Sequence, residues 1–193
     1  MPELFKQLDY ELFLLINGAS NGFFDTLMVW VSSMALWTPL YVLLAYLIFR
    51  KYKIRGFVAI GFLLLAVVLS DFVSVHLFKN VFLRLRPCYE PELSGMVKNI
   101  VGCGGQYGFV SSHASNSFAI VGMVILLMED KYKYLKWVMP IWGISIMYSR
   151  IYLGKHYPSD VVFGALLGLL VAYPVFLLFK LTIGYLSRSL TNT

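Results

Sequence analysis

Five long apolar blocks, separated by short polar segments, constrain the fold of this chain more than any other feature. They cover residues 26–49, 57–78, 112–128, 135–153 and 161–183. Each approaches the roughly 20 residues that a helix needs to cross the hydrocarbon core of a bilayer. The chain is 59% hydrophobic and 13% charged, far less polar than a soluble domain of this size. We therefore predict an all-α polytopic membrane bundle of five transmembrane helices, forming a single domain over residues 1–193.

The first residues predict a helix that lies in the membrane interface. Apolar residues recur at helical spacing over residues 2–17, as Leu4, Phe5, Leu8, Leu12, Leu15 and Ile16. Such a pattern is typical of an amphipathic interfacial helix. A poorly inserted first span is the alternative, but the polar residues from Asn17 to Asp25 argue against it.

Basic residues concentrate in two of the short loops. Residues 50–55 contain four Lys or Arg, and residues 129–136 contain three Lys. The number of spans places both loops on one face, which the positive-inside rule makes cytoplasmic. Membrane topology therefore accounts for the net charge of +6, and we expect no nucleic-acid partner.

The remaining ionisable residues fall at the opposite ends of the predicted spans. These are Lys79 and Arg86, then Ser111, Ser112 and His113, then Ser149 and Arg150, and finally His156 and Asp160. Ionisable groups at the ends of apolar helices are costly, so their presence suggests a function. Because the parity of the spans brings all four groups to one face, we expect a single extracytoplasmic site.

Each group also has a structural interpretation. Lys79 and Arg86 can hold phosphate oxygens or can extend toward lipid headgroups. Ser111 and Ser112 begin a helix, where free amides bind anions, but a serine there can also be a simple N-cap. His113 at this helix start could donate a proton.

The run from Ser149 to Asp160 is the most specific of these patterns. Pro158 suits the first turn of a helix, which places His156 just before it and Asp160 within it. A carboxylate four residues on can accept one ring N–H and leave the other nitrogen as a nucleophile. A structural His–Asp hydrogen bond is the alternative.

Three motifs together resemble those of the type 2 phosphatidic acid phosphatase superfamily, over about residues 57–183. They are Lys79-x6-Arg86-Pro87, Ser111-Ser112-His113 and Ser149-Arg150-x5-His156-x3-Asp160. The resemblance implies a metal-independent lipid phosphate hydrolase that needs no cofactor. One departure is Ser112, where the family usually has a glycine whose amide approaches the phosphate.

The resemblance also implies a role for each site residue. His156 would attack phosphorus to form a phosphohistidine, Asp160 would orient it, and His113 would protonate the leaving group. Lys79, Arg86 and Arg150 would hold the phosphoryl oxygens, aided by Ser111 and by amides near Ser112. Such a division of labour suits phosphoryl transfer, in which positioning and charge stabilisation supply most of the catalysis.

The expected substrate and partner is a lipid phosphate in the bilayer, with undecaprenyl diphosphate narrowly first. Phosphatidylglycerol phosphate, phosphatidic acid and lipid A are the other candidates. We expect the enzyme in a bacterial inner membrane with its site outside the cytoplasm. A lipid phosphotransferase would use the same residues. A transporter would need polar residues across the whole membrane, and the inner halves of 112–128 and 161–183 are almost wholly apolar.

Several other residues leave alternatives open. Cys88 and Cys103 predict either a disulfide in an extracytoplasmic loop or two free thiols. Asp71 predicts a hydrogen bond to a neighbouring helix, or support of Lys79. His76 and Arg84 have no assigned role. Gly164 and Gly168 predict close helix packing inside the bundle.

Overall fold

The computed structural model describes residues 3–191, and their side chains as far as residue 188. Its main helices are α1 (Glu3–Gly18), α2 (Gly22–Ser32), α3 (Met34–Tyr52), α4 (Gly56–Val73), α6 (Ser112–Met128), α7 (Leu135–Tyr152) and α8 (Pro158–Thr191). Short helical turns occupy Lys53–Arg55, Ser74–Lys79, α5 (Asn80–Phe82), Pro87–Tyr89 and Pro91–Leu93. The predicted all-helical class is confirmed: the described residues contain one isolated β-bridge, between Leu85 and Tyr107, and no strand.

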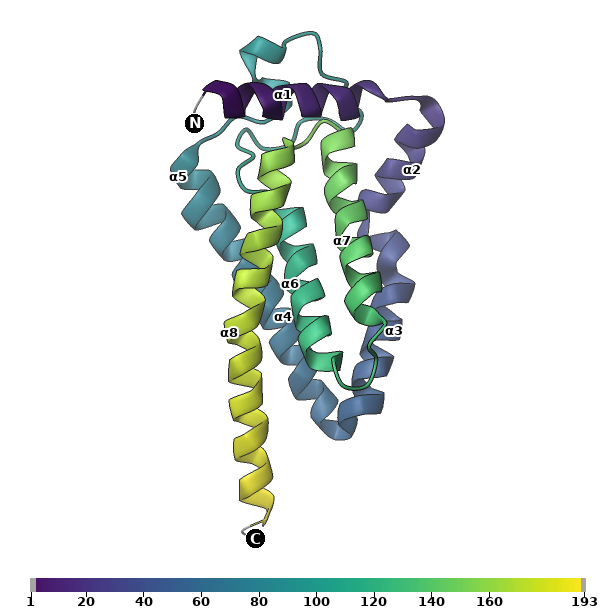
Figure 1. Ribbon diagram of the computed structural model, residues 1–193, viewed down its shortest axis with the longest axis vertical. Coiled ribbons are helices and arrows are strands. Elements are labelled where there is room, and N and C mark those ends of the chain that lie inside the picture. Colours follow the sequence, from purple (N-terminus) through teal and green to yellow (C-terminus); the bar gives the residue numbers. More distant parts are fainter. Residues whose placement is uncertain (1–2, 192–193) are drawn as a thin grey trace.

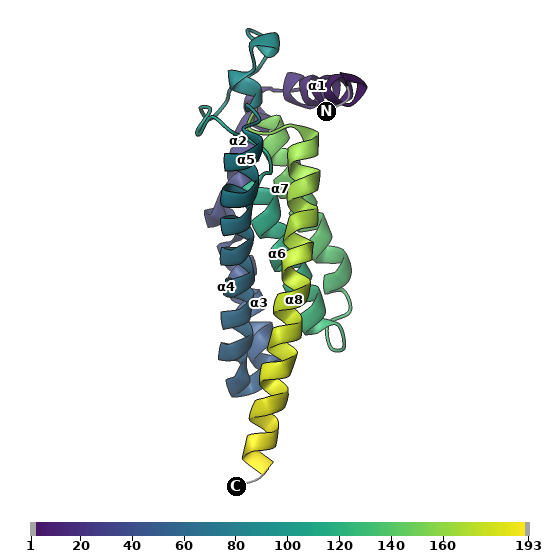
Figure 2. The same ribbon diagram turned by 90° about the vertical axis from the view of Figure 1, so that its left-hand side faces the viewer.

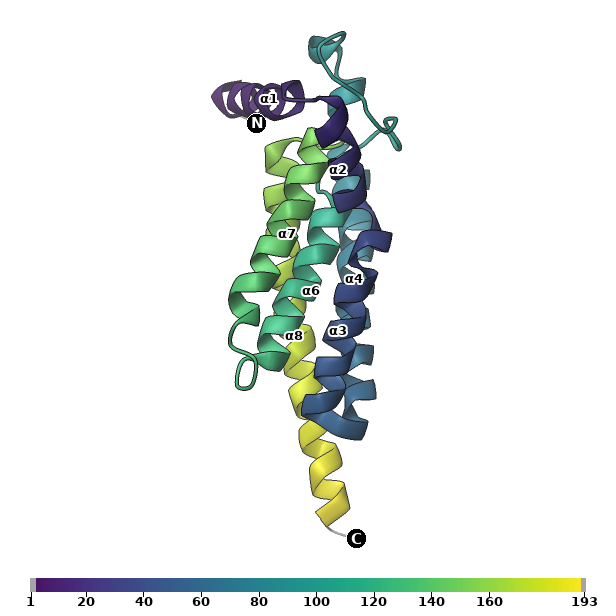
Figure 3. The ribbon, with the colours of Figure 1, turned by 90° about the vertical axis from the view of Figure 1, so that its right-hand side faces the viewer.

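Long apolar helices run side by side along the molecule (Figures 1 and 3). By length and composition, two described helical stretches could cross a bilayer, Met34–Phe82 and Pro158–Arg188. The bent pair α1 and α2, which meet at 113°, could add a third. The stretch from Met34 turns back at Lys53, which has a φ of 52°, so α3 and α4 form a hairpin in Figure 1. The count of five spans therefore stays a prediction.

The block predicted as one span over 26–49 is divided into two helices. The break lies at Ser33, whose backbone is extended, with φ −88° and ψ 144°. The Ser33 hydroxyl donates to the Trp30 carbonyl oxygen at 2.9 Å, and Trp37 Nε1 donates to the Val31 carbonyl oxygen at 2.8 Å. These bonds satisfy groups that the end of α2 leaves free. Side-chain hydrogen bonds thus stabilise a break where the apolar pattern predicted none.

Helix α1 lies across one end of the bundle (Figures 1 and 2). Its buried stripe is Asp9, Phe13 and Asn17. The Asn17 side chain donates to the carbonyl oxygens of Lys98 and Tyr152 at 2.9 and 2.8 Å. The leucines of the opposite stripe are exposed, as Leu4, Leu8, Leu12 and Leu15. This arrangement agrees with the helix predicted over 2–17, of which residue 2 lies outside the described part.

Helix α6 is the centre of the core, packed against α4, α7 and α8. Two glycines of α8 permit its close approach to α6. A Cβ atom on Gly164 would lie 2.6 Å from the Ser111 carbonyl oxygen, and one on Gly168 would lie 2.7 Å from the Ala119 nitrogen. Both distances are shorter than any real Cβ contact, so these glycines serve helix packing within the bundle, as predicted.

The two basic loops meet at the end of the bundle opposite α1. Lys51 Nζ donates to Asp130 Oδ2 at 3.1 Å, and Lys131 Nζ donates to the Arg50 carbonyl oxygen at 3.3 Å. The sequence placed these loops on one face by counting spans. Their contact confirms that they share one end of the molecule.

Candidate functional site

The four polar groups predicted from the sequence meet beneath α1. The π-helical turn that extends α4 ends at Lys79, and the loop after it carries Arg86. Helix α6 begins at Ser112, α7 ends two residues after Arg150, and α8 begins two residues after His156. Segments that are far apart in the sequence therefore contribute to one site.

His156 and Asp160 form the centre of the site. Asp160 Oδ2 lies 3.4 Å from His156 Nδ1, and the side chains are 0% and 2% exposed, respectively. Their alignment does not make this a hydrogen bond, because Nδ1 has no partner of acceptable geometry. Asp160 Oδ2 also accepts from the Tyr157 backbone N–H at 3.0 Å. The carboxylate is thus fixed on the Nδ1 side of the ring, as the sequence predicted for a carboxylate four residues after the histidine.

Positive charges surround His156. Burial, followed by the charges of Arg86, Arg150 and Lys79, holds the pKa of His156 well below its usual value of 6.5. An imidazole with a lowered pKa is neutral at neutral pH, and the neutral ring is the nucleophilic form. Three of the predicted cations therefore lower the basicity of this ring.

We predict that the acid limb of kcat/KM lies below pH 6.5. The direction of this shift follows from the lowered pKa of His156. The ring stays neutral as the pH falls through 6.5, and it protonates only at lower pH. The measurement is a pH profile of kcat/KM, with the titration of the substrate phosphate followed separately by ³¹P NMR. A limb at or above pH 6.5, after correction for the substrate, would contradict the prediction.

Three predicted phosphate ligands have no carboxylate partner. Lys79 Nζ donates to the Ser112 hydroxyl at 2.5 Å, and Arg86 donates from Nε and Nη1 to the carbonyl oxygens of Tyr107 and Cys103, both at 3.2 Å. Arg150, 8% exposed, bonds to the Ser32 hydroxyl through Nη1, while its Nε is buried without a partner. Among the described side chains, none of these cations lies within ion-pair distance of an acid. Charges withdrawn from water are normally paired. Because Arg150 is buried and Lys79 and Arg86 are half-buried, this set is suited to an anion.

The start of α6 gives its two serines different roles. Ser111 is fully buried, and its hydroxyl accepts from the Ala114 N–H at 3.5 Å as an N-cap. Its own N–H donates to the Asp160 carbonyl oxygen at 3.0 Å, which joins α6 to α8. The Ser112 hydroxyl contacts both Lys79 Nζ and, at 2.7 Å, the Ser74 hydroxyl. The hydroxyl of Ser111 is therefore an N-cap, a role compatible with the predicted anion site, and the hydroxyl of Ser112 bonds to the predicted phosphate ligand Lys79.

His113 faces a cavity of about 350 Å³ between α3, α4 and α6. The polar residues that line it include Ser32, Ser112, His113, Asp71 and Asn116. A second, apolar groove of about 370 Å³ shares four lining residues with it, namely Met34, Tyr41, Val67 and Ile120. The two cavities are therefore adjacent, one beside the predicted acid and the other in the apolar part of the bundle.

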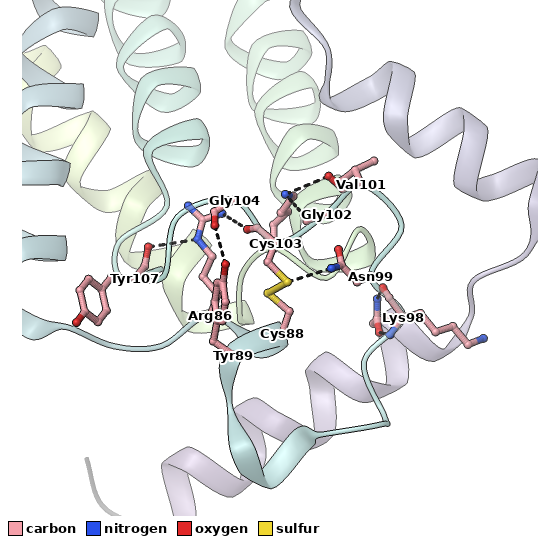
Figure 4. Close-up of a disulfide and its surroundings, with 12 residues drawn as sticks. Arg86, Cys88, Tyr89, Lys98, Asn99, Val101, Gly102, Cys103, Gly104 and Tyr107 are labelled. Atoms are coloured by element: carbon pink, nitrogen blue, oxygen red, sulfur yellow. Dashed lines mark hydrogen bonds between the residues drawn. A yellow bond between two sulfur atoms is a disulfide. The ribbon is translucent and has the colours of Figure 1, made fainter.

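The loop that follows Arg86 contains a disulfide (Figure 4). Cys88 and Cys103 are bonded, with 6.0 Å between their Cα atoms, which decides between the two alternatives for these cysteines. Two hydrogen bonds hold this loop next to Arg86. The Cys103 carbonyl oxygen accepts from Arg86 Nη1, and the Tyr89 hydroxyl donates to the Gly104 carbonyl oxygen.

Gly108 of the same loop lies directly over the central pair. A Cβ atom there would lie 3.0 Å from Asp160 Oδ2 and 3.5 Å from His156 Nδ1. The absence of a side chain at this position therefore lets the loop close over the two groups.

Three further polar residues make hydrogen-bond contacts close to the site or within their own helices. Asp71 Oδ1 accepts from Asn116 Nδ2 at 3.1 Å, which confirms the predicted bond to a neighbouring helix. His76 Nδ1 lies 3.0 Å from the Phe72 carbonyl oxygen, on an exposed side of its own helix. The Ser149 hydroxyl donates to the Ile146 carbonyl oxygen at 2.7 Å and so stays within α7.

Arg84 and Lys155 are the cations whose place the sequence did not reveal. Arg84 Nη1 donates to Asp160 Oδ1 at 2.9 Å, and Nη2 donates to Asp9 Oδ2 at 2.6 Å. Lys155 is 8% exposed and bonds to the Gly102 carbonyl oxygen of the loop. Asp9 could have indicated the place of Arg84, because it is a carboxylate on a helix whose other face is lined by leucines and so could need a buried cation as partner.

The described residues contain no cluster of three or more His, Cys, Asp or Glu side chains able to hold a metal ion.

Comparison with known proteins gives one consistent result. Residues 59–183 match the model of the PAP2 superfamily. Lipid A 4'-phosphatase from Porphyromonas gingivalis is 31% identical over 180 residues, which cover 90% of this chain and 74% of that protein. Undecaprenyl-diphosphatase BcrC from Bacillus subtilis is 25% identical over 88% of this chain and 83% of its own length. The crystal structure of Aquifex aeolicus LpxE has a TM-score of 0.68 and 29% identity, covering 88% of this chain and 94% of that one.

Proposed function

This chain belongs to the PAP2 superfamily and is a membrane lipid phosphatase, and we propose that it works through a phosphohistidine on His156, outside the cytoplasm. The observation that carries the proposal is the set of cations without carboxylate partners around a buried, neutral imidazole. A tetrahedral phosphoryl group supplies the missing negative charge. Its three free oxygens match the three cations Lys79, Arg86 and Arg150.

The proposed reaction has two displacements at phosphorus. In the first, Nε2 of His156 forms an N–P bond while the bond from phosphorus to the lipid oxygen breaks, and His113 donates a proton to that oxygen. In the second, His113 accepts a proton from water, whose oxygen attacks phosphorus as the N–P bond breaks. Inorganic phosphate leaves, and both imidazoles return to their starting states. Asp160 stabilises the positive charge that the His156 ring carries between the two steps.

The cavities of the bundle offer a binding site for the lipid part of the substrate. The cavity behind His113 begins with polar groups and continues into the apolar groove lined by α3 and α4. We propose that the headgroup remains in the polar part and the hydrocarbon chain extends along the groove. The proton from His113 then reaches the oxygen at the mouth of the cavity.

The proposed topology has five spans with the site facing away from the cytoplasm. The helical blocks α2 with α3, α4, α6, α7 and α8 would be these spans, and α1 would lie in the outer interface with its leucines toward lipid. The basic loops at the opposite end favour a cytoplasmic position there. The Cys88–Cys103 disulfide suits an oxidising compartment, such as the periplasmic side of a bacterial inner membrane.

A panel of purified lipid phosphates, assayed for phosphate release in detergent with and without EDTA, tests this proposal. We predict turnover of at least one lipid A, undecaprenyl or glycerophospholipid phosphate, unchanged by EDTA. By their names, the two relatives act on lipid A phosphate and on undecaprenyl diphosphate. The panel therefore ranks these two substrate classes for this chain. An absolute need for Mg²⁺ would contradict the mechanism. Transfer of the phosphoryl group to an added lipid, with no free phosphate, would favour a phosphotransferase.

A further inference from the structure

Two carboxylates share one guanidinium beneath α1. Arg84 bonds to Asp9 through Nη2 at 2.6 Å and to Asp160 through Nη1 at 2.9 Å. Asp9 is 5% exposed and Asp160 is fully buried. Burial lowers the pKa of Arg84, but the charges of Asp160 and Asp9 outweigh burial and raise it. The guanidinium is therefore permanently charged and holds one acid on each side.

Ser159 completes a closed set of hydrogen bonds around this guanidinium. Its hydroxyl accepts from Arg84 Nη1 at 2.6 Å and donates to Asp9 Oδ2 at 2.5 Å, while its backbone N–H donates to Asp9 Oδ1 at 2.9 Å. The Arg84 guanidinium also lies 4.2 Å from the centre of the Tyr157 ring. Asp9 thus binds the residue directly before Asp160, in addition to the arginine that binds Asp160.

Aromatic contacts fix the same part of α1 to the loop that carries His156. The Tyr10 ring stacks on the Tyr157 ring at 5.2 Å between centroids, and the Phe13 ring meets it edge-on at 5.6 Å. Tyr157 follows His156 directly and is itself fully buried. The buried stripe of α1 therefore packs on the segment that contains both members of the central pair.

We propose that Asp9 is a positioning residue for His156, an inference that rests on the proposed function. Asp9 holds Arg84 and the first turn of α8 so that Asp160 Oδ2 faces Nδ1 of the ring. It also balances the charge of Arg84, which leaves the charge of Asp160 available to the imidazole. By this means α1, which presents leucines to the outside, is linked to the nucleophile.

The charges around the His156 ring determine in which direction the loss of Asp9 would shift the basicity of the ring. The groups that face His156 are Lys79, Arg86, Arg150, His113 and Asp160. Asp160 is the single negative group among them, and Arg84 without Asp9 would neutralise it. Loss of Asp9 therefore makes the ring less basic and less able to carry positive charge when phosphorus bonds to it.

The test compares Asp9→Asn with Glu11→Gln in the full-length chain in detergent, using the best substrate from the lipid panel. Both changes remove one carboxylate from α1, but Glu11 is exposed and accepts only from Gln7, at 3.0 Å. We expect Asp9→Asn to lower kcat about tenfold through misplacement of the pair, with KM little changed, and to move the acid limb of kcat/KM to lower pH. Glu11→Gln keeps the wild-type kcat and limb.

Two results would overturn the inference. One is a folded Asp9→Asn protein with the wild-type kcat and pH limb, and the other is an equal effect of Glu11→Gln. If Asp9→Asn does not fold, Ser159→Ala tests the inference instead, because it keeps every charge and removes two hydrogen bonds of the set. A several-fold loss of kcat in Ser159→Ala supports the inference. A wild-type kcat overturns it. Absence of any hydrolysis by the wild-type chain would overturn the proposed function, and this inference with it.

Discussion

Replacement of His156 by alanine abolishes phosphate release from a lipid phosphate, with a loss in kcat of at least about 10⁴-fold. His156 is the proposed nucleophile: its ring is buried, has a lowered pKa, and has Nδ1 on the side of Asp160. Without the ring no N–P bond forms, and the remaining cations bind substrate without reacting. Phosphate release by the purified variant, followed over hours, measures the loss.

A matched imidazole provides the control for this result. His76 is exposed and stacks on Phe72 of its own helix, with 4.2 Å between the ring centres. We expect His76→Ala to keep kcat within about twofold, as for a surface change away from the site. Undiminished turnover in a folded His156→Ala protein would refute the assignment of the nucleophile.

Arg150→Lys is expected to lower kcat/KM about 100-fold, the usual cost of one lost charge-stabilising donor. Arg150 is almost fully buried, one terminal nitrogen is held by Ser32, and its Nε has no partner in the described structure. Lysine has a single ammonium group and cannot bond to Ser32 and to a phosphoryl oxygen in the same planar arrangement. Steady-state kinetics, together with inhibition by orthovanadate, measure the loss.

Arg50→Lys is the corresponding control, because Arg50 lies at the opposite end of the bundle, 5.8 Å from the centre of the Tyr46 ring. Its kinetics and its vanadate inhibition stay close to those of the wild-type chain. An Arg150→Lys protein that retains wild-type kcat/KM and vanadate affinity would exclude Arg150 from the phosphoryl site.

The sequence predicted those features that depend on local pattern. The apolar blocks located α4, α6, α7 and α8, and Pro158 located the start of α8. Counting the blocks brought Lys79, Arg150 and His156 to one end, where the structure places them. Gly164 and Gly168 were identified as packing residues from their spacing alone, and their contacts with α6 are those of a tight helix pair.

Features that depend on distant partners were not predictable in the same way. The break at Ser33 follows Ser32, whose hydroxyl contacts Arg150, 118 residues along the chain. Asp9 is buried because Arg84 and Ser159 lie beneath α1, and neither residue is near it in sequence. The N–H of Ser111 bonds to the Asp160 carbonyl oxygen, a contact between α6 and α8 that the sequence did not indicate. Each of these contacts joins segments that are far apart in the sequence, which a local pattern does not reveal.

The most direct test of this account is an experimental structure of the protein with orthovanadate, which adopts the five-coordinate geometry of phosphorus during transfer. The account predicts vanadium bonded to Nε2 of His156, with its equatorial oxygens contacting Lys79, Arg86 and Arg150, and an apical oxygen within reach of His113. Vanadate bound elsewhere, or bound at this end of the bundle without contact to His156, would contradict it.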